Sequence, residues 1–281
     1  MQKPTLAIIG PGRAGSALGR ALQRAGYPIA AIGGRNPESI GSLAEELGAR
    51  ACPTPAAALE LADLTLLAVP DDVIATVAAE IATRLTAAGG RAAGGRAAVH
   101  LSGAQDCAPL QPLATAGLQI GVFHPLQTFR RGVEAAKNVR GSYIGVDADP
   151  PLYSQLSAMV EAVGGHAFDL AGVDRALYHA AAVFAANYPV MLVAEAAALA
   201  RQAGLGEETA NRGMTMLLAG AVANLKSTSP DEALTGPAAR GDLGTIVRHL
   251  DALSRDPELQ RLYQLLADRA MKLAKKSEEA A

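Results

Sequence analysis

A glycine-rich turn near the N-terminus has the residue types and the spacing that bind a diphosphate group. The sequence Gly10-Pro11-Gly12-Arg13-Ala14-Gly15 follows an apolar run at 6–9, which predicts a buried strand, and leads into helical sequence at 14–25. In this G-x-G-x-x-G pattern the glycines permit a tight turn, a close approach of the backbone to a pyrophosphate, and close packing of helix on strand. Free N–H groups at the helix N-terminus then face the phosphates. A second apolar strand predicted at 28–32 supports a dinucleotide site.

The residues after that second strand favour the phosphorylated cofactor NADP(H). A site for NAD holds the ribose 2′-hydroxyl with an acidic residue about 20 positions beyond the glycines. Here that place reads Gly33-Gly34-Arg35-Asn36, and no carboxylate occurs between Gly15 and Glu38. Arginine binds phosphate through two parallel hydrogen bonds, so we expect Arg35, with Asn36 beside it, to bind a 2′-phosphate. The alternative is a solvated arginine, because Gly-Arg-Asn-Pro is also good turn sequence.

Length and composition are typical of a compact soluble protein. A chain of 281 residues exceeds a comfortable single core, which favours two domains. The formal net charge of -2 gives no basic surface for nucleic acid, and we expect neither a nucleic-acid partner nor a membrane-spanning segment. Cys52 and Cys107 lack metal-ligand spacing, so no metal site and no disulfide is expected. We predict a cytoplasmic location.

Strand and helix signals alternate along the first half of the chain and then change in kind. Apolar runs at 64–69, 97–101, 118–123 and 142–146 predict strands, and helical periodicity separates them, as at 73–85. This alternation predicts an α/β fold of the Rossmann type, with a mostly parallel, doubly wound sheet. After residue 169 only helices are predicted, at 173–202, 207–225, 243–254 and 257–275.

The predicted organisation is therefore an NADP-binding Rossmann domain at 1–169 and an all-α substrate and dimerisation domain at 170–281. The segment 173–202 is apolar on so many faces that we expect the helix to be buried. One chain of this size offers little cover for such a helix. We therefore expect a homodimer that forms through the helical domain.

Polar residues follow three of the predicted strands, at the sheet edge where ligands bind in such folds. Val69 and Pro70 close the strand at 64–69 and are expected to lie near the adenosine ribose, whereas Asp71 or Asp72 is better explained as a helix N-cap. Ser102 and His124 come at the ends of the next two strands and are expected to line the nicotinamide site. For His124, an isolated structural histidine is the alternative.

The long predicted helix contains two outstanding polar positions, His179, which follows Tyr178, and Asn187. Burying such groups without partners costs about 1–3 kcal/mol, so they should have partners or a ligand. Eight positions separate them by about 80° around a helix, so both can border one pocket. We expect His179 to protonate a carbonyl oxygen as hydride arrives and Asn187 to orient the substrate. The alternative is a hydrogen bond between packed helices.

A glycine- and proline-rich loop near residue 240 supplies the remaining candidate. Asp242 is well explained as the N-cap of the helix that follows it. Arg240 lies in a loop between helices, where it could bind a substrate carboxylate or a cofactor phosphate.

Taken together, these motifs resemble the Rossmann-like proteins with a DUF2520 C-terminal domain, over essentially the whole chain. The matching segments are the glycine-rich turn, His100-Leu101-Ser102-Gly103, His124-Pro125-Leu126-Gln127-Thr128-Phe129, Tyr178-His179-Ala180-Ala181 through Asn187-Tyr188, and Leu234-Thr235-Gly236-Pro237 through Arg240-Gly241-Asp242. The family resembles the 6-phosphogluconate dehydrogenase-like reductases, of which some relatives are assigned as ketopantoate reductases. The resemblance implies an NADPH-linked reductase of a small carbonyl or imine compound.

The resemblance leaves the substrate open. Members of the larger group place a catalytic lysine on the long interdomain helix, whereas 173–202 contains no lysine, and we expect His179 to replace it. A 2-oxo acid, with ketopantoate first, is the expected substrate. The Phe-His-Pro run is also similar to prephenate dehydrogenases, and the layout is similar to pyrroline-5-carboxylate reductases. A non-catalytic NADP(H)-binding sensor or scaffold is a further alternative.

Overall fold

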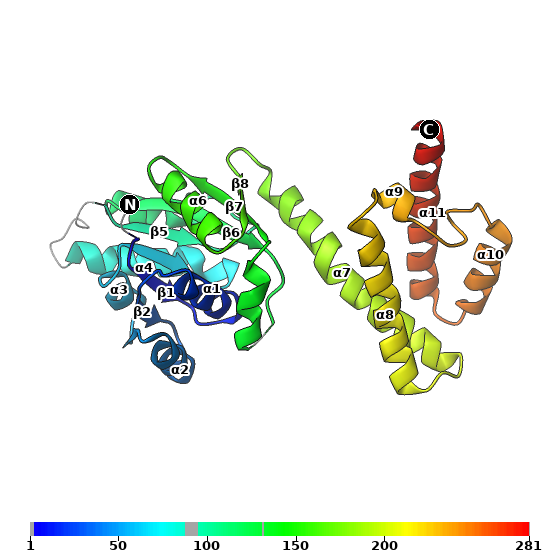
Figure 1. The fold of residues 1–281 in the computed structure, drawn as a ribbon, viewed down its shortest axis with the longest axis horizontal. Coiled ribbons are helices and arrows are strands. Elements are labelled where there is room, and N and C mark those ends of the chain that lie inside the picture. The colour runs from blue at the N-terminus through cyan, green and yellow to red at the C-terminus, as the bar shows by residue number, and fades with distance from the viewer. Residues whose placement is uncertain (1–2, 88–94, 131, 281) are drawn as a thin grey trace. The chain divides into compact units, whose positions relative to one another are not determined.

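The computed structural model describes residues 3–87, 95–130 and 132–280. The chain divides into two compact units, Met1–Ala186 and Asn187–Ala281, and the division falls inside one long helix. The first unit combines helices with a sheet, and the second is helical (Figure 1). The predicted fold class is confirmed, since a mostly parallel α/β sheet is followed by a helical region. The predicted domain boundary at 169 and 170 stays a prediction.

The sheet of the first unit has the order β3-β2-β1-β4-β5-β6-β7-β8 among the described residues. All neighbouring strands are parallel except β6 and β7, which are antiparallel. The order reverses at β1, so the carboxyl ends of β1 and β4 flank the point where doubly wound sheets bind ligands. The strands are β1 Leu6–Ile9, β2 Ile29–Gly33, β3 Arg50–Cys52, β4 Leu64–Leu67, β5 Ala97–His100, β6 Gln119–Leu126, β7 Tyr143–Ala148 and β8 His166–Asp169.

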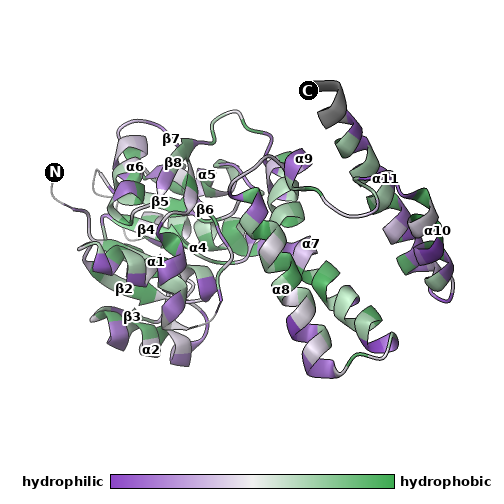
Figure 2. Ribbon diagram, turned by 45° about the vertical axis from the view of Figure 1, so that its right-hand side comes forward, coloured by the Kyte–Doolittle hydropathy of each residue, from purple (hydrophilic) through white to green (hydrophobic). Residues whose placement is uncertain are grey.

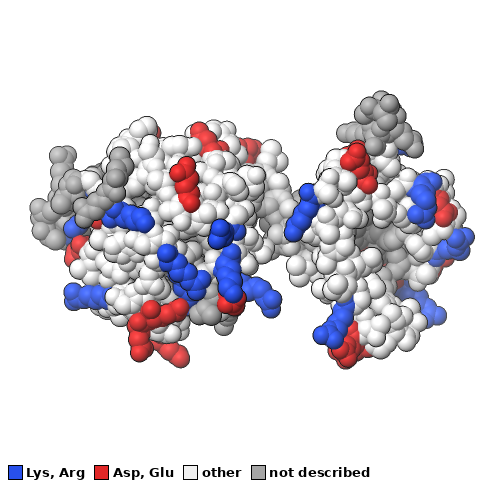
Figure 3. Space-filling model, viewed as in Figure 1, with Lys and Arg blue, Asp and Glu red and all other residues white. Residues whose placement is uncertain are grey.

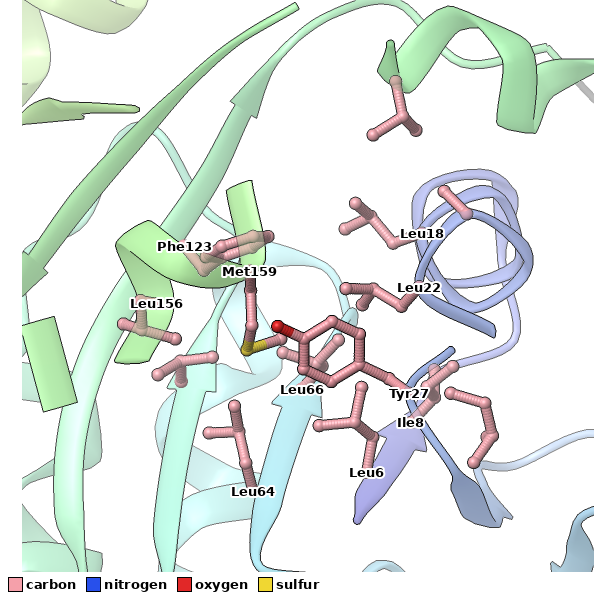
Figure 4. Packing of buried hydrophobic residues seen from close by; sticks show 14 of the residues in the cluster. Leu6, Ile8, Leu18, Leu22, Tyr27, Leu64, Leu66, Phe123, Leu156 and Met159 are labelled. Carbon is pink, nitrogen blue, oxygen red and sulfur yellow. The ribbon is translucent and has the colours of Figure 1, made fainter. Parts of the chain in front are cut away.

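Helices cover both faces of this sheet. They are α1 Arg13–Arg24, α2 Pro37–Leu47, α3 Pro55–Leu59, α4 Ile74–Ala87, α5 Gln111–Thr115 and α6 Leu152–Ala162, with short 3-10 turns η1 Asp71–Val73, η2 Ala108–Leu110 and η3 Val133–Val139. Alternate residues of a strand point to opposite faces. Leu6 and Ile8 of β1 therefore pack with α1 and α6 (Figure 4), whereas Ala7 and Ile9 pack with α3 and α4 on the other face.

Local capping explains where several of these helices begin. Asn36 accepts a hydrogen bond from the backbone N–H of Ser39 at 3.0 Å and so caps α2, in which Pro37 takes the first position. Asp242 caps the later helix α10 in the same manner, as predicted. The predicted cap at Asp71 or Asp72 is wrong. Both residues lie inside the 3-10 turn η1, whose side chains make no cap hydrogen bond, because the backbone already turns at the preceding proline.

The sequence predicted the described C-terminal helices, except for the four-residue helix α9. They are α7 Arg175–Gln202, α8 Glu207–Leu225, α9 Pro230–Ala233, α10 Leu243–Ala252 and α11 Pro257–Ala280. The short helix α9 begins with a capping box, in which Ser229 and Glu232 bond reciprocally to backbone N–H groups.

The predicted burial of the long helix is wrong for the single chain. Only 6% of the most apolar 18-residue window of α7 is buried, and Leu177 and Val190 are 71% and 68% exposed. Hydrophobic residues also mark the neighbouring helix α8 in Figure 2. The reason is that the described residues of one chain provide too few apolar side chains to cover the helix. By length and composition, α7 is also long enough and apolar enough to cross a membrane.

The central strand β4 provides a test of where stability resides. Leu66 is fully buried in the core between the sheet and its helices, so Leu66→Ala should lower the free energy of unfolding by about 2–5 kcal/mol. Leu61→Ala is the matched control. Leu61 is 38% exposed, so this variant should lose clearly less free energy of unfolding. Urea denaturation followed by circular dichroism measures both variants. Equal losses would contradict a core centred on β4.

Candidate functional site

The glycine-rich turn between β1 and α1 excludes side chains at two positions and leaves the third open. Gly10 has a φ of 99°, and a Cβ atom there would lie 2.4 Å from the carbonyl oxygen of Ala68. A Cβ atom on Gly15 would lie 2.3 Å from the carbonyl oxygen of Gly10. Nothing stands within 4 Å of the corresponding position on Gly12, so backbone at this point is open to a ligand. These are the three properties that a pyrophosphate-binding turn needs.

A cavity of about 700 Å³ lies beside this turn, and we call it the adenosine pocket. It brings together most of the predicted cofactor residues, namely Gly10, Gly12, Arg35, Asn36, Val69 and Pro70. The apolar side chains of Val73 and Val77 complete its wall. Apolar walls suit a base, the guanidinium of Arg35 adds a positive charge to the lining, and Glu80 adds a carboxylate. The residues present therefore fit an adenine nucleotide. Ala14 is half-buried in the first turn of α1, and Arg13 beside it lines a neighbouring cavity.

Ser102 lies in a hydrogen-bonded loop just after β5. Its backbone N–H donates to Nδ1 of His100 at 3.1 Å, and Nε2 of that buried ring lies 2.7 Å from the carbonyl oxygen of Asp106. His100 therefore carries its proton on Nε2, and burial lowers the pKa of the ring. The hydroxyl oxygen of Ser102 accepts two backbone hydrogen bonds, from Ala104 and Gln105. Among the described residues, its own O–H donates no hydrogen bond.

His124 on β6 meets the start of α7. Its Nδ1 lies 2.7 Å from the hydroxyl oxygen of Tyr178, and its ring centroid lies 6.4 Å from that of His179. We call these three residues the histidine cluster. Gly103 admits the ring, because a Cβ atom on it would lie 2.6 Å from Nε2 of His124. The structure thus brings together His124, His179 and the loop after β5, as the sequence predicts.

The surroundings of His124 and Tyr178 keep these two side chains uncharged at neutral pH. Burial, and to a smaller extent the neighbouring His179, Arg175 and His100, lower the pKa of His124 to about 4. Burial also raises the pKa of Tyr178. The 2.7 Å hydrogen bond therefore joins a neutral imidazole to a neutral phenol, each of which can donate or accept a proton.

Arg175, which the sequence analysis missed, joins the first turn of α7 to β7. Its side chain is only 8% exposed, and its Nη2 lies 2.5 Å from Oδ2 of Asp147. Its Nη1 and Nδ1 of His179 are buried without a hydrogen-bond partner among the described residues. The available signal was spacing, because an arginine three positions before Tyr178 shares a helix face with it.

The two remaining candidates belong to the second unit. Asn187 and Arg240 are exposed there, and their predicted contacts with a substrate stay predictions. Within residues 3–87, 95–130 and 132–280, no group of His, Cys, Asp or Glu has the arrangement of a metal site.

Comparison with known families assigns both parts of the chain. Residues 5–88 match the family described as NADP oxidoreductase coenzyme F420-dependent, and residues 142–270 match DUF2520, a domain of unknown function. This chain joins a Rossmann-like NADP oxidoreductase domain to a DUF2520 domain. The predicted family is therefore confirmed, and its N-terminal domain belongs to an NADP-binding family.

Solved structures share the fold of this DUF2520 protein along nearly its whole length. An NADP oxidoreductase candidate from Bacteroides fragilis is 26% identical, with a TM-score of 0.78, and the match covers 96% of this chain and 98% of that one. A Streptomyces aurantiacus imine reductase is 19% identical, with a TM-score of 0.64 and coverages of 98% and 99%. Plasmodium falciparum pyrroline carboxylate reductase with NADP bound is 13% identical, with a TM-score of 0.62 and coverages of 98% and 99%. No protein of curated function gives a significant match.

The lowered pKa of His124 predicts a distinct titration. The ring should gain a proton only near pH 4 in the folded protein, as followed by NMR of the ring carbon-bound protons. An unfolded histidine titrates near pH 6.5, so between about 6.5 and 4 the unfolded chain binds more protons and stability falls as pH falls. His124→Gln should flatten this part of the stability profile. A ring that titrates above about pH 6 would contradict the desolvated environment.

Proposed function

We propose that this protein uses NADPH to reduce a small 2-oxo acid, with ketopantoate the first candidate. The observation that carries the proposal is the histidine cluster, which stands beyond the carboxyl end of β5 on the sheet whose β1 leads into the glycine-rich turn. In doubly wound sheets this edge binds both cofactor and substrate. When bound, NADPH supplies a hydride, so the protein has to supply a proton and hold the carbonyl group.

We assign the proton to His179. Its side chain is half-buried beside His124, and imidazole exchanges protons readily near neutral pH. No lysine occurs between residues 175 and 202, so a lysine of this helix is not available for the same task. The hydrogen bond between His124 and Tyr178 fixes both side chains beside His179. The O–H of Ser102 donates a hydrogen bond to the substrate.

The remaining polar candidates complete the assignment. Asn187 orients the substrate, and Arg240 binds its carboxylate. Val69, Pro70, Arg35 and Asn36 bind the adenosine part of the cofactor, and the turn from Gly10 to Gly15 binds the pyrophosphate.

A cyclic imine is the second candidate substrate. The likeness in fold to an imine reductase and to a pyrroline carboxylate reductase favours it. Reduction of C=N needs the same two contributions as reduction of C=O, a hydride and a proton. A prephenate-like substrate and a non-catalytic NADP(H)-binding role are the other outcomes that the following experiment separates.

The test follows NADPH oxidation with a panel of 2-oxo acids led by ketopantoate, together with pyrroline-5-carboxylate, and with prephenate plus NADP⁺. His179→Ala should lower kcat at least about 100-fold on the active compound, because a positioned acid contributes this much, and should leave NADPH affinity within about twofold. His166→Ala, which removes an exposed histidine of β8, is the matched control and should retain activity. Tight NADPH binding without turnover across the panel would favour the non-catalytic role.

We further propose that a second copy of the chain covers the helical unit. Within the described residues of that unit, only Ile246 and Leu253 are large apolar side chains that are buried. Exposed large apolar residues lie on several helices, including Val190, Met216, Leu217, Val247 and Leu265 of α7, α8, α10 and α11. One peptide or one helix cannot cover a surface spread over four helices, whereas a second copy supplies four equivalent helices.

Sedimentation equilibrium should therefore find a dimer in solution. Leu217→Glu places a charge on a residue that is 71% exposed and should shift the protein toward monomer by at least about tenfold in dissociation constant, because a buried charge at an interface is costly. Leu61→Glu, in the first unit, is the control and should leave the dimer intact. A wild-type monomer at micromolar concentration, or one that binds lipid vesicles through α7, would contradict the proposal.

A further inference from the structure

A second, polar cavity adjoins the adenosine pocket, and we call it the arginine pocket. Its volume is about 540 Å³. It is lined by Pro11, Gly12, Arg13, Ser16, Arg20, Asn36, Ser39, Arg130 and Gly132. Pro11, Gly12, Asn36 and Ser39 line both cavities, whereas Arg35 lines only the adenosine pocket. The two cavities therefore share one wall, with an arginine on each side of it.

The charges of the arginine pocket are all positive. Three of its lining residues are arginines, and none carries a carboxylate. Arg20 is already bonded, since its guanidinium makes two hydrogen bonds of 2.6 Å to Glu46. Arg13 and Arg130 form no hydrogen bond or ion pair with any residue that the structure describes. Two guanidinium groups thus have unused donors beside the same cavity. Figure 3 shows Lys and Arg side chains gathered on this face of the first unit.

The backbone around the pocket adds unused donors. Gly12 is the N-cap residue of α1 and offers no side-chain acceptor, so the first N–H groups of this helix lack a capping acceptor. The amide oxygen of Asn36 accepts a hydrogen bond from the N–H of Ser39, and the amide N–H₂ of Asn36 remains as a donor. Donors on three sides and no acceptor charge are the features of an anion site.

The elements before and after Arg130 in the chain place it near α1. It follows β6, the strand that carries His124, and it precedes η3, which packs against α1. The segment between β6 and η3 therefore places a guanidinium beside the glycine-rich turn, although more than 100 residues separate them in sequence.

We propose that the arginine pocket binds the 2′-phosphate of NADPH, with Arg13 and Arg130 as its charged ligands. The inference rests on the proposed cofactor. A ribose bound in the adenosine pocket would meet the wall that the two cavities share, and Asn36 and Ser39 of that wall would separate its 2′-phosphate from Arg35 and leave the arginine pocket to hold it. NADH has no such phosphate, so Arg13 and Arg130 favour NADPH alone. Arg130 is then a residue that determines cofactor specificity, and it follows β6, the strand that carries His124.

Binding of nucleotide fragments tests this without a substrate. Adenosine 2′,5′-bisphosphate and AMP differ only in the 2′-phosphate, and titration calorimetry measures both on the full-length protein. Arg130→Ala and Arg13→Ala should each weaken the bisphosphate about tenfold or more and change AMP affinity less than about twofold, because only the bisphosphate loses a charge-assisted hydrogen bond. Arg24→Ala is the matched control, since it removes one exposed positive charge from the same helix outside the pocket, and both affinities should stay within twofold.

The competing location is tested by Arg35→Ala in the same titrations. If this variant alone loses the preference for the bisphosphate, and Arg13→Ala and Arg130→Ala keep it, the phosphate binds in the adenosine pocket and the inference is wrong. If the wild-type protein binds the bisphosphate no better than AMP, both this inference and the proposed cofactor are overturned. Unchanged AMP affinity in each variant shows that the fold of the nucleotide site is intact.

Discussion

The lack of side chains at Gly10 and Gly15 is the constraint on which the nucleotide end of this structure depends. Any Cβ atom at these positions would meet backbone oxygens at 2.4 and 2.3 Å, so α1 can lie this close to β1 and β4 only with glycine there. The position of α1 in turn places Pro11 and Gly12 as the wall between two cavities and Arg13 at the entrance of one. A single steric requirement thus determines where a base, a pyrophosphate and a further phosphate can bind.

The opposite end of the site depends on how α7 leaves the sheet. Two side-chain contacts, three residues apart on one helix face, join it to neighbouring antiparallel strands: Arg175 to Asp147 of β7, and Tyr178 to His124 of β6. The first contact is an ion pair, and the second is a hydrogen bond between neutral groups. Together these two contacts fix the first turn of α7 against the sheet and so determine where the next residue, His179, lies.

Local patterns predicted what depends on local sequence, and they failed where distant segments meet. The glycine-rich turn, β1, α8 and the cap at Asp242 follow from residues within one turn or one periodic run. The edge strand β8 was not foreseen, because it is short and largely exposed and so lacks an apolar run. Arg130 and Arg175 were missed because their partners are distant in sequence. Arg130 lines a cavity together with residues of α1, and Arg175 forms an ion pair with Asp147. The exposure of α7 depends on which other segments pack against it, and the apolar pattern of α7 itself does not identify those segments.

The charges around His124 bear on the choice between a 2-oxo acid and an imine. Among the neighbours that lower the pKa of this ring, namely His179, Arg175 and His100, Arg175 brings a permanent positive charge. A positive field favours groups that carry or gain negative charge, and it disfavours cations. A carbonyl oxygen gains negative charge as hydride reaches its carbon, whereas an imine is activated by becoming a cation first. The charge of Arg175 therefore supports our proposal of a 2-oxo acid ahead of an imine.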